Sequence, residues 1–285
     1  MIIFFMFLGL LALVLINVPI AVALAVVASA AMVFAHGPDV LPNVALVMMD
    51  GATNFPLIAI PLFILAGAIM NSTGISRRLI AFASAIFGFV KGGLAMVNIG
   101  ASLFFAEISG SAVADVAALG SILIPSMKKK GYPAPFAAAV TSSSATLAVI
   151  IPPSIPMILY AVMAQSSVVQ LFVAGIVPGV LGGFLMMVVA HRFAVHYNYP
   201  VEEVFKVSQV VATFKDAALA FTLPLIILGG IFGGFVTATE GAGLAVVAAM
   251  VIGAIYRELD WPHLKQAMID GSVQTAVVML LVAAS

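Results

Sequence analysis

Residues 91–131 read KGGLAMVNIGASLFFAEISGSAVADVAALGSILIPSMKKKG, an apolar segment with a basic anchor at each end. Lys91 opens the segment and Lys128-Lys129-Lys130 close it, and lysines collect on the cytoplasmic flanks of membrane segments. Ser109-Gly110-Ser111 stands at the midpoint, where a turn is expected. The stretch between the anchors is too short for two full spans of about 20 apolar residues each. We therefore predict a helix–turn–helix over residues 92–127 that enters the membrane and returns to the same side.

The tip of this hairpin is the first candidate site. Non-helical backbone at membrane depth persists only inside protein or beside a wet cavity, because unpaired amides are costly in lipid. Glu107 and Asp115 flank the tip, and carboxylates within the membrane are functional by default because burying them is expensive. In the alternative interpretation, Asp115 caps the returning helix and Glu107 meets a buried basic or polar partner. The residue types favour the binding role for Asp115 and leave both interpretations open for Glu107.

A second interrupted segment follows over residues 133–165. Thr141-Ser142-Ser143-Ser144 forms a row of hydroxyls, and Pro152, Pro153 and Pro156 fall shortly after it. Proline lacks the N–H that an α-helix needs and restrains the residue before it, so the helix is predicted to unwind there. Unwound carbonyls and hydroxyls suit a small hard cation, whereas the N-termini of half-helices suit an anion. The alternative is a kinked structural helix whose serines bond to their own turn, and three prolines beside this row favour the binding break.

The composition around these segments indicates the class of protein. Of 285 residues, 64% are hydrophobic and 8% are charged, whereas a soluble domain has about 25% charged residues. So few charges exclude a soluble enzyme, a nucleic-acid-binding protein and a disordered regulator. Eleven Lys and Arg balance eleven Asp and Glu, and the absence of cysteine excludes disulfides, thiolate metal sites and a cysteine nucleophile. We predict an all-α polytopic membrane protein.

Long charge-free stretches locate the membrane segments, because a charge at the bilayer centre costs about 3 kcal/mol. Residues 1–35, 51–76 and 131–190 contain no charged side chain. The first stretch is too long for the apolar core of a signal peptide, and we predict a retained segment bent around Asn17-Val18-Pro19. The more polar residues 191–216 are predicted as a solvated loop or interfacial helix that joins two halves.

Two parts of the sequence resemble each other in one register. Residues 48–52 (MMDGA) resemble residues 268–272 (MIDGS), and the same offset aligns residues 20–34 with residues 240–254. Two pairs of similar segments at the same offset predict an internal duplication. Many secondary transporters are built from such repeated halves. Whether the copies are inverted depends on how often each crosses the membrane, which the sequence leaves open.

The second copy is expected to be incomplete. The last apolar run, from Gly271 to Ser285, is too short to cross about 30 Å of hydrocarbon. We therefore expect a C-terminally truncated chain, with the rest of the second copy beyond it. Thr239 and Glu240, beside several glycines, form a candidate site in this copy, although close helix packing explains the glycines equally well.

Residues 98–115, with Glu107-Ile108-Ser109-Gly110-Ser111 at their centre, resemble the first hairpin of the large membrane subunit of tripartite ATP-independent periplasmic (TRAP) transporters. Residues 125–127, 137–144 and 151–154 extend the similarity. The resemblance implies an elevator-type secondary transporter built from two inverted repeats with re-entrant hairpins, the second repeat being incomplete here. It also implies sodium-driven import of small organic acids, of the sialic acid or C4-dicarboxylate class, across the bacterial inner membrane. A small membrane subunit and a periplasmic substrate-binding protein are the implied partners.

The same resemblance assigns residues to a site for sodium and substrate, with no organic cofactor. The hairpin would supply Ser109, Gly110, Ser111 and Asp115, and the broken helix would add Thr141, Ser142, Ser143, Ser144, Pro152 and Pro153. The implied parts of the chain are scaffold and arm helices over 1–90, a transport-domain part over 91–168, a last span with the polar connector over 169–215, and the truncated start of the second repeat over 216–285.

Other functions are weighed against this one. An intramembrane enzyme needs a nucleophile with its base or a metal site, and the sequence has neither an H-E-x-x-H nor a G-x-S-x-G motif. An ion channel with re-entrant loops, or an organic-anion transporter that works without a binding protein, would use the same hairpins. An ATP-driven permease would need an ATPase as its partner, because this chain has no phosphate-binding loop.

Overall fold

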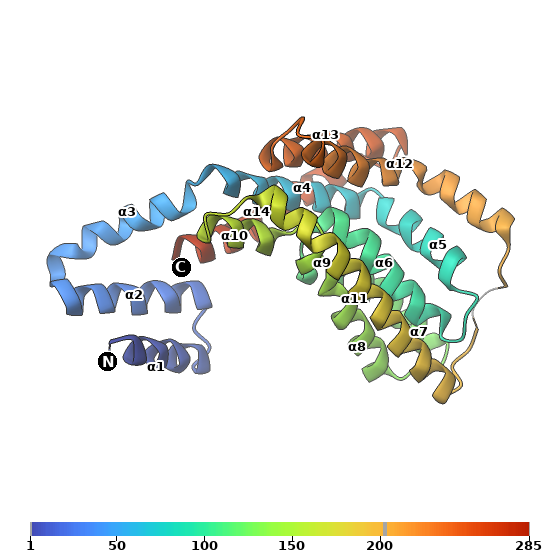
Figure 1. Cartoon of the computed structure of the whole chain (residues 1–285), viewed down its shortest axis with the longest axis horizontal. Helices are drawn as coiled ribbons and strands as arrows, with labels where there is room; N and C mark the ends of the chain where they lie inside the picture. Colours follow the sequence, from blue (N-terminus) through green and yellow to red (C-terminus); the bar gives the residue numbers. More distant parts are fainter. Residues whose placement is uncertain (1, 202–203, 285) are drawn as a thin grey trace. The chain divides into compact units, whose positions relative to one another are not determined.

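The computed structural model describes residues 2–201 and 204–284, except for the side chains of residues 107–109 (Figure 1). Every regular element within these ranges is a helix, as the sequence predicts. Two compact units divide the chain, one made of residues 1–58 with 272–285 and the other of residues 59–271. The four-part division inferred from the sequence stays a prediction.

The smaller unit consists of short apolar helices. Its elements are α1 (Ile2–Leu15), α2 (Ile20–His36), η1 (Pro38–Val40), α3 (Leu41–Ala52), η2 (Phe55–Ile58) and the end of α14 (Trp261–Ala284). α1 packs against α2, and between them Asn17 adopts a left-handed φ of 67° while Pro19 directly precedes α2. Asparagine tolerates this conformation and proline cannot continue a helix, so the chain breaks at the predicted bend.

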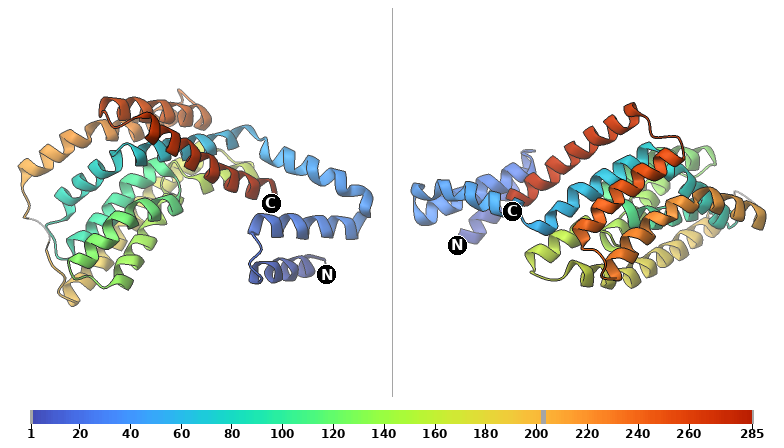
Figure 2. Two further views of the ribbon diagram at one scale, coloured as in Figure 1. Left: turned by 180° about the vertical axis from the view of Figure 1, so that it is seen from behind. Right: turned by 90° about the horizontal axis from the view of Figure 1, so that it is seen from above.

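The larger unit contains the hairpin and the broken helix. Its elements are α4 (Ala59–Ser72), α5 (Ile75–Phe87), α6 (Gly93–Ser109), α7 (Ala112–Lys129), α8 (Ala134–Ala145), α9 (Leu147–Ile150), α10 (Ile155–Met163), α11 (Val168–His196), α12 (Val207–Phe232), α13 (Ala238–Ile255) and the start of α14. α4 and α13 run side by side (Figure 2), and α5 packs against both α6 and α12.

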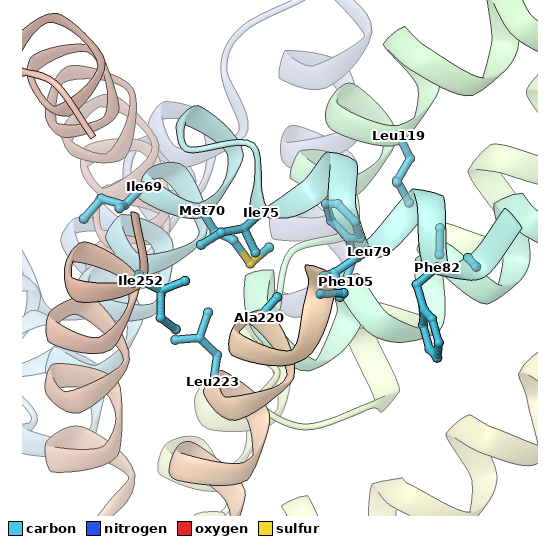
Figure 3. Close-up of a cluster of buried hydrophobic side chains, with 14 of the residues drawn as sticks. Ile69, Met70, Ile75, Leu79, Phe82, Phe105, Leu119, Ala220, Leu223 and Ile252 are labelled. Atoms are coloured by element: carbon cyan, nitrogen blue, oxygen red, sulfur yellow. The ribbon is translucent and has the colours of Figure 1, made fainter. Parts of the chain in front are cut away.

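One apolar core joins α5 to the hairpin (Figure 3). α5 supplies Ile75, Leu79 and Phe82, whose spacing of three or four residues places them on one face of the helix. Phe105 of α6 and Leu119 of α7 belong to the same buried cluster. Each fully buried side chain of this size contributes about 1.5–3 kcal/mol, so the core fixes both limbs of the hairpin against α5.

Arg78 on α5 is the centre of a polar cluster in the same unit. Its Nη2 lies 2.8 Å from Glu258 Oε1, its Nε lies 3.4 Å from Asp216 Oδ1, and its guanidinium carbon stands 3.9 Å from the centre of the Tyr256 ring. The Arg78 guanidinium, through its hydrogen bond, lowers the pKa of Glu258 below the ordinary glutamate value, and Glu258 raises the pKa of Arg78. The cluster thus ties α5 to α12 and to the turn between α13 and α14.

Several described helices are suited to cross a membrane. Five are long and apolar enough, and the bent pair of residues 134–150 and 155–163 is either a sixth, broken span or a re-entrant loop. The five are Phe55–Ser72, Val168–His196, Val207–Phe232, Ala238–Ile255 and Trp261–Ala284. The expectation that the last membrane segment is too short to cross is wrong, because its helix begins at Trp261, ten residues before Gly271. The chain is therefore a multi-pass membrane protein.

Neither hairpin limb is among the described helices suited to cross a membrane. α6 has 17 residues, which is about 25 Å of helix at 1.5 Å per residue. α7 has 18 residues, as many as α13, but it contains Asp115, Lys128 and Lys129. Length alone therefore does not distinguish the limbs from full spans, and partial entry into the bilayer stays a prediction.

The polar connector is shorter than the predicted range of residues 191–216. α11 continues to His196 and α12 already begins at Val207, so both long helices extend into that range. Charged side chains on a helix surface do not interrupt the backbone, and the next proline along the chain is Pro200. Polarity alone therefore overestimated the connector at both ends.

The connector closes the base of the hairpin. The Gly92 N–H donates to the Pro200 carbonyl oxygen at 3.1 Å, and Lys91 Nζ donates to Asn198 Oδ1 at 3.1 Å. His191 Nδ1 lies 3.1 Å from the Lys91 carbonyl oxygen. The end of α11 and the segment after it are thus joined to the two residues before α6 by three polar contacts.

The helix bounds follow the register of the sequence repeat. The offset that aligns residues 48–52 with 268–272 also carries the first residue of α3, Leu41, onto the first residue of α14, Trp261. The same offset carries the bounds of α2 nearly onto those of α13. The matching bounds support the internal duplication, and they do not fix the orientation of the two copies.

Candidate functional site

The hairpin turns where the sequence predicts a turn. α6 ends at Ser109, Gly110 is left-handed with φ of 58°, and α7 begins at Ala112. Glycine meets little steric resistance at positive φ, so it is the residue expected at such a reversal. The side chains of Ser109 and Glu107 lie outside the described residues.

The second predicted break is present as well. α9 ends at Ile150, α10 begins at Ile155, and the two helical stretches on either side are bent by 42°. Pro152 and Pro153 lie buried within the break and are joined by a cis peptide bond. The prolines interrupt the ladder of backbone hydrogen bonds, as the sequence predicts.

The two breaks meet at one point. The Ile155 N–H donates to the Gly110 carbonyl oxygen at 3.2 Å. A Cβ on Gly110 would lie 2.7 Å from the carbonyl oxygen of Pro153, so only glycine fits against this backbone. The hairpin tip and the proline break, which are well separated in the sequence, therefore form one site.

Four helix ends converge on this site. α6 and α9 end there, and α7 and α10 begin there. Ser111 Oγ accepts from the Ala114 N–H and Ser154 Oγ accepts from the Met157 N–H, both at 3.4 Å, so each starting helix has a serine cap. Starting helices carry partial positive charge and ending helices carry partial negative charge, so the site can attract an anion and a cation together.

Ser154 is a site residue that the sequence prediction omits. It is fully buried, and its Oγ donates to the Val149 carbonyl oxygen at 2.7 Å while capping α10. One hydroxyl therefore bridges the end of one half-helix and the start of the next. A serine directly after two prolines and before an apolar run is an N-cap signal that identifies it.

Asp115 lies in the first turn of α7 and is 1% exposed. The N-cap residue of α7 is Ser111, and Asp115 stands four residues after it. A carboxylate in the first turn is favoured by the helix dipole, which lowers the cost of burying it. Asp115 is thus buried next to the tip, and its binding role and its role in capping the helix both stay predictions.

The predicted row of hydroxyls divides into two pairs. Thr141 and Ser144 are buried, whereas Ser142 and Ser143 are exposed. Thr141 Oγ1 donates to the Ala137 carbonyl oxygen at 2.9 Å, a bond to its own turn. Residues at positions three apart share a helix face, so the two pairs point in different directions.

Glu240 and Thr239 belong to the start of α13. Glu240 is exposed, its Oε2 accepts from the Thr237 N–H at 2.8 Å, and Thr237 Oγ1 accepts from the Glu240 N–H at 3.3 Å. This reciprocal pair is a capping box and gives the carboxylate a local structural role. A binding site at Thr239 and Glu240 stays a prediction.

Apolar spans, a broken helix and a hairpin whose tip meets the break define a membrane transport protein. Within the part of the chain that the structure describes, no three His, Asp or Glu side chains gather as a metal site would require. Residues 7–285 match the family model described as tripartite ATP-independent periplasmic transporter, DctM component. The chain belongs to this family, whose members among the relatives are transporter permeases and not enzymes.

Three relatives illustrate the similarity. YgiK of Salmonella typhimurium is 40% identical over 272 residues, which cover 95% of this chain and 62% of that protein. The C4-dicarboxylate TRAP transporter large permease protein DctM of Pseudomonas aeruginosa is 38% identical over 86% of this chain and 58% of its own length. The sialic acid TRAP transporter permease protein SiaT of Haemophilus influenzae is 39% identical over 80% of this chain and 37% of its own length. The chain thus spans less than two thirds of the length of these relatives.

Proposed function

We propose that this chain belongs to the large permease of a sodium-coupled, binding-protein-dependent importer of small organic acids. The transporter would work by an elevator mechanism in the bacterial inner membrane. The observation that carries the proposal is the contact of Gly110 with the proline break, which joins two interrupted helices at one point. Irregular backbone at membrane depth is tolerated where it is buried in protein or lines a cavity, and many transporters place their binding sites at such breaks.

Sodium would bind to oxygen atoms at this point. Helices that end within a protein leave carbonyl oxygens unpaired, and α6 and α9 both end at the site. The predicted ligands are Ser109, Gly110 and Ser111 on the hairpin and Pro152 and Pro153 at the break, with Ser142 and Ser143 offering exposed hydroxyls. Asp115 would add the negative charge that favours a cation.

The acid would bind to the starting helices. Organic acids carry carboxylates at neutral pH, and the N-termini of α7 and α10 attract negative charge. Ser111 caps α7 and would be the nearest hydroxyl donor, whereas the Ser154 hydroxyl caps α10 and already donates to the Val149 carbonyl oxygen. A cation and an anion would therefore neutralise each other in one site, which lowers the cost of moving both through lipid.

The proposal of an elevator mechanism rests on the internal duplication of the chain. The bounds of α13 repeat those of α2, and α14 begins where α3 begins, at nearly one offset, and repeated halves underlie many secondary transporters. The relatives whose names give a substrate carry different acids, among them C4-dicarboxylates and sialic acid. These names support the substrate class and leave the particular acid undefined.

The partners follow from the family description. A tripartite, periplasmic transporter supports a small membrane subunit and a periplasmic substrate-binding protein beside this permease. The description as ATP-independent supports an ion gradient as the energy source, to which the membrane potential adds about 2.3 kcal/mol per net charge per 100 mV.

Uptake into vesicles tests the proposal. Full-length permease, its small subunit and its binding protein would be reconstituted in liposomes and given labelled sialic acid or a labelled C4-dicarboxylate. We expect uptake with an inward sodium gradient and none with potassium in its place. Equal uptake in potassium rejects sodium coupling, uptake without the binding protein rejects that dependence, and single-channel currents would indicate a channel instead.

A further inference from the structure

Asn98 is a fully buried amide on α6, five residues after the helix begins at Gly93. Its Nδ2 donates to Thr141 Oγ1 at 2.7 Å and to Met127 Sδ at 3.8 Å. Its Oδ1 lies 3.4 Å from Ser144 Oγ, whose one hydroxyl hydrogen can be donated either to it or to the Thr141 carbonyl oxygen at 3.2 Å. An amide nitrogen has two N–H groups, so both are used here.

Ser102 extends this network by one turn of α6. Its Oγ donates to Ser144 Oγ at 2.8 Å, and both residues are fully buried. Asn98 and Ser102 are four residues apart on α6, and Thr141 and Ser144 are three residues apart on α8, so each pair shares one face of its helix. The two polar pairs therefore face each other across an otherwise apolar contact.

The network joins three helices. Asn98 is on the first hairpin limb, Met127 is on the second limb α7, and Thr141 and Ser144 are on the first part of the broken helix. A buried polar group that loses its partner costs about 1–3 kcal/mol, so a sliding movement of either limb is penalised. We propose that Asn98, with Ser102 as its neighbour, is a positioning residue that locks both hairpin limbs to α8.

The register of α6 against α8 that this network maintains is the register in which the hairpin tip can contact the proline break. Gly110 lies twelve residues beyond Asn98, which is about 18 Å along a stiff helix. A shift of α6 by one residue moves the tip by about 1.5 Å. The bond from the Ile155 N–H to the Gly110 carbonyl oxygen is already 3.2 Å long, and a shift of that size breaks it.

The four hydroxyls of residues 141–144 then have two different roles. Thr141 and Ser144 serve the interhelical network, which leaves Ser142 and Ser143 as the exposed pair of the row. The positioning role rests on the proposed function only where uptake is measured. The register itself can be measured without sodium or substrate.

Distance measurements between spin labels test the register. The chain has no cysteine, so Val113→Cys and Ala138→Cys place one label on the exposed start of α7 and one on α8. The test variant combines Asn98→Leu, Ser102→Ala, Thr141→Val and Ser144→Ala in the full-length protein, with any cysteine beyond this chain replaced by serine. Removing all partners together leaves no buried polar group of the network unpaired, so the variant is expected to fold.

We expect a clearly broadened distance distribution in this variant. The matched control is Ser121→Ala, because the Ser121 hydroxyl is exposed and donates only to the Ala118 carbonyl oxygen of its own helix at 2.9 Å. The conservative Thr141→Ser keeps the hydroxyl and should keep the parent distribution. A parent-like distribution in the combined variant, or equal broadening in Ser121→Ala, overturns the proposal.

Two further measurements complete the test. If the combined variant does not fold, Ser102→Ala alone removes one bond and should still broaden the distribution, and an unchanged distribution counts against the proposal. In uptake, the pair Asn98→Leu and Ser102→Ala, which leaves Thr141 and Ser144 bonded to carbonyl oxygens of their own helix, should raise the half-saturating sodium concentration about tenfold while the rate at saturating sodium changes less than about twofold. Sodium-independent uptake by the parent protein, with a broadened distribution in the variant, refutes the proposed function and leaves the positioning role standing.

Discussion

Replacing Gly110 by alanine probes the contact between the hairpin tip and the proline break. Gly110 has φ of 58°, and a left-handed conformation costs an L-residue roughly 1–2 kcal/mol. The new Cβ would also lie 2.7 Å from the Pro153 carbonyl oxygen, well inside the separation of about 3.5 Å at which such atoms attract. The neighbouring atom belongs to backbone, so the tip must move away from the break.

Gly131 provides a matched control. Its φ is 87°, and a Cβ there meets no atom within 4 Å. Gly131→Ala therefore carries the conformational cost alone, whereas Gly110→Ala carries the same cost and the backbone clash. We expect Gly131→Ala to lower the free energy of unfolding by roughly 1–2 kcal/mol, and Gly110→Ala to lower it further because of the clash.

The steric clash of an alanine at position 110 should weaken sodium binding. We expect Gly110→Ala to raise the half-saturating sodium concentration for uptake at least tenfold, which corresponds to about 1.4 kcal/mol. Gly131→Ala should leave that concentration within about twofold of the parent value. Equal sodium dependence in the two variants would refute the view that the tip contact builds the ion site.

Three other changes test neighbouring features. Ser154→Ala removes the cap of α10 and the bond to the Val149 carbonyl oxygen, so we expect the free energy of unfolding to fall by about 1–2 kcal/mol, measured by chemical denaturation. Asp115→Asn keeps the size of the buried side chain and removes its charge. Sodium-driven uptake should therefore fall at least tenfold, while the thermal unfolding temperature changes little. Full uptake by this variant would show that the charge is not used. Arg78 holds the pKa of Glu258 below the ordinary glutamate value, so this carboxylate stabilises the fold above about pH 4.3 and that contribution disappears as the pH falls through its lowered pKa. Glu258→Gln should remove this part of the acid dependence, and an unchanged acid limb of the unfolding curve would exclude the ion pair as its source.

Turns and breaks could be predicted from the sequence because they depend on local chemistry. Gly110 and the prolines at 152 and 153 act on their own backbone, and the structure has a turn and a break at those positions. The cap at Ser154 had the same kind of local signal, and its position between the prolines and the next helix could have identified it. Local signals of this kind need no knowledge of the packing.

Contacts between distant residues could not be predicted in the same way. Arg78 meets Glu258 across 180 residues of sequence, and nothing near either residue indicates the partner. Asn98 looks like a single polar residue in an apolar run, although Ser102 lies four residues after it and Thr141 and Ser144 lie three residues apart, so that each pair shares one face of its helix. Such complementary spacing is a usable signal once two helices are expected to pack against each other.

The hairpin is hydrogen-bonded to other segments at three positions along its length, which are its base, its middle and its tip. Its base is bonded to the connector through Gly92 and Pro200, its middle is bonded to α8 through Asn98, and its tip is bonded to the second half-helix through Gly110 and Ile155. The middle and tip contacts both join the hairpin to the same broken helix, so separating the two would break buried bonds at both places. An elevator that exposes the site to either side would therefore have to carry the hairpin and the broken helix together and slide against other helices. The register that Asn98 maintains would then be a property of the moving part itself, present in both of its positions.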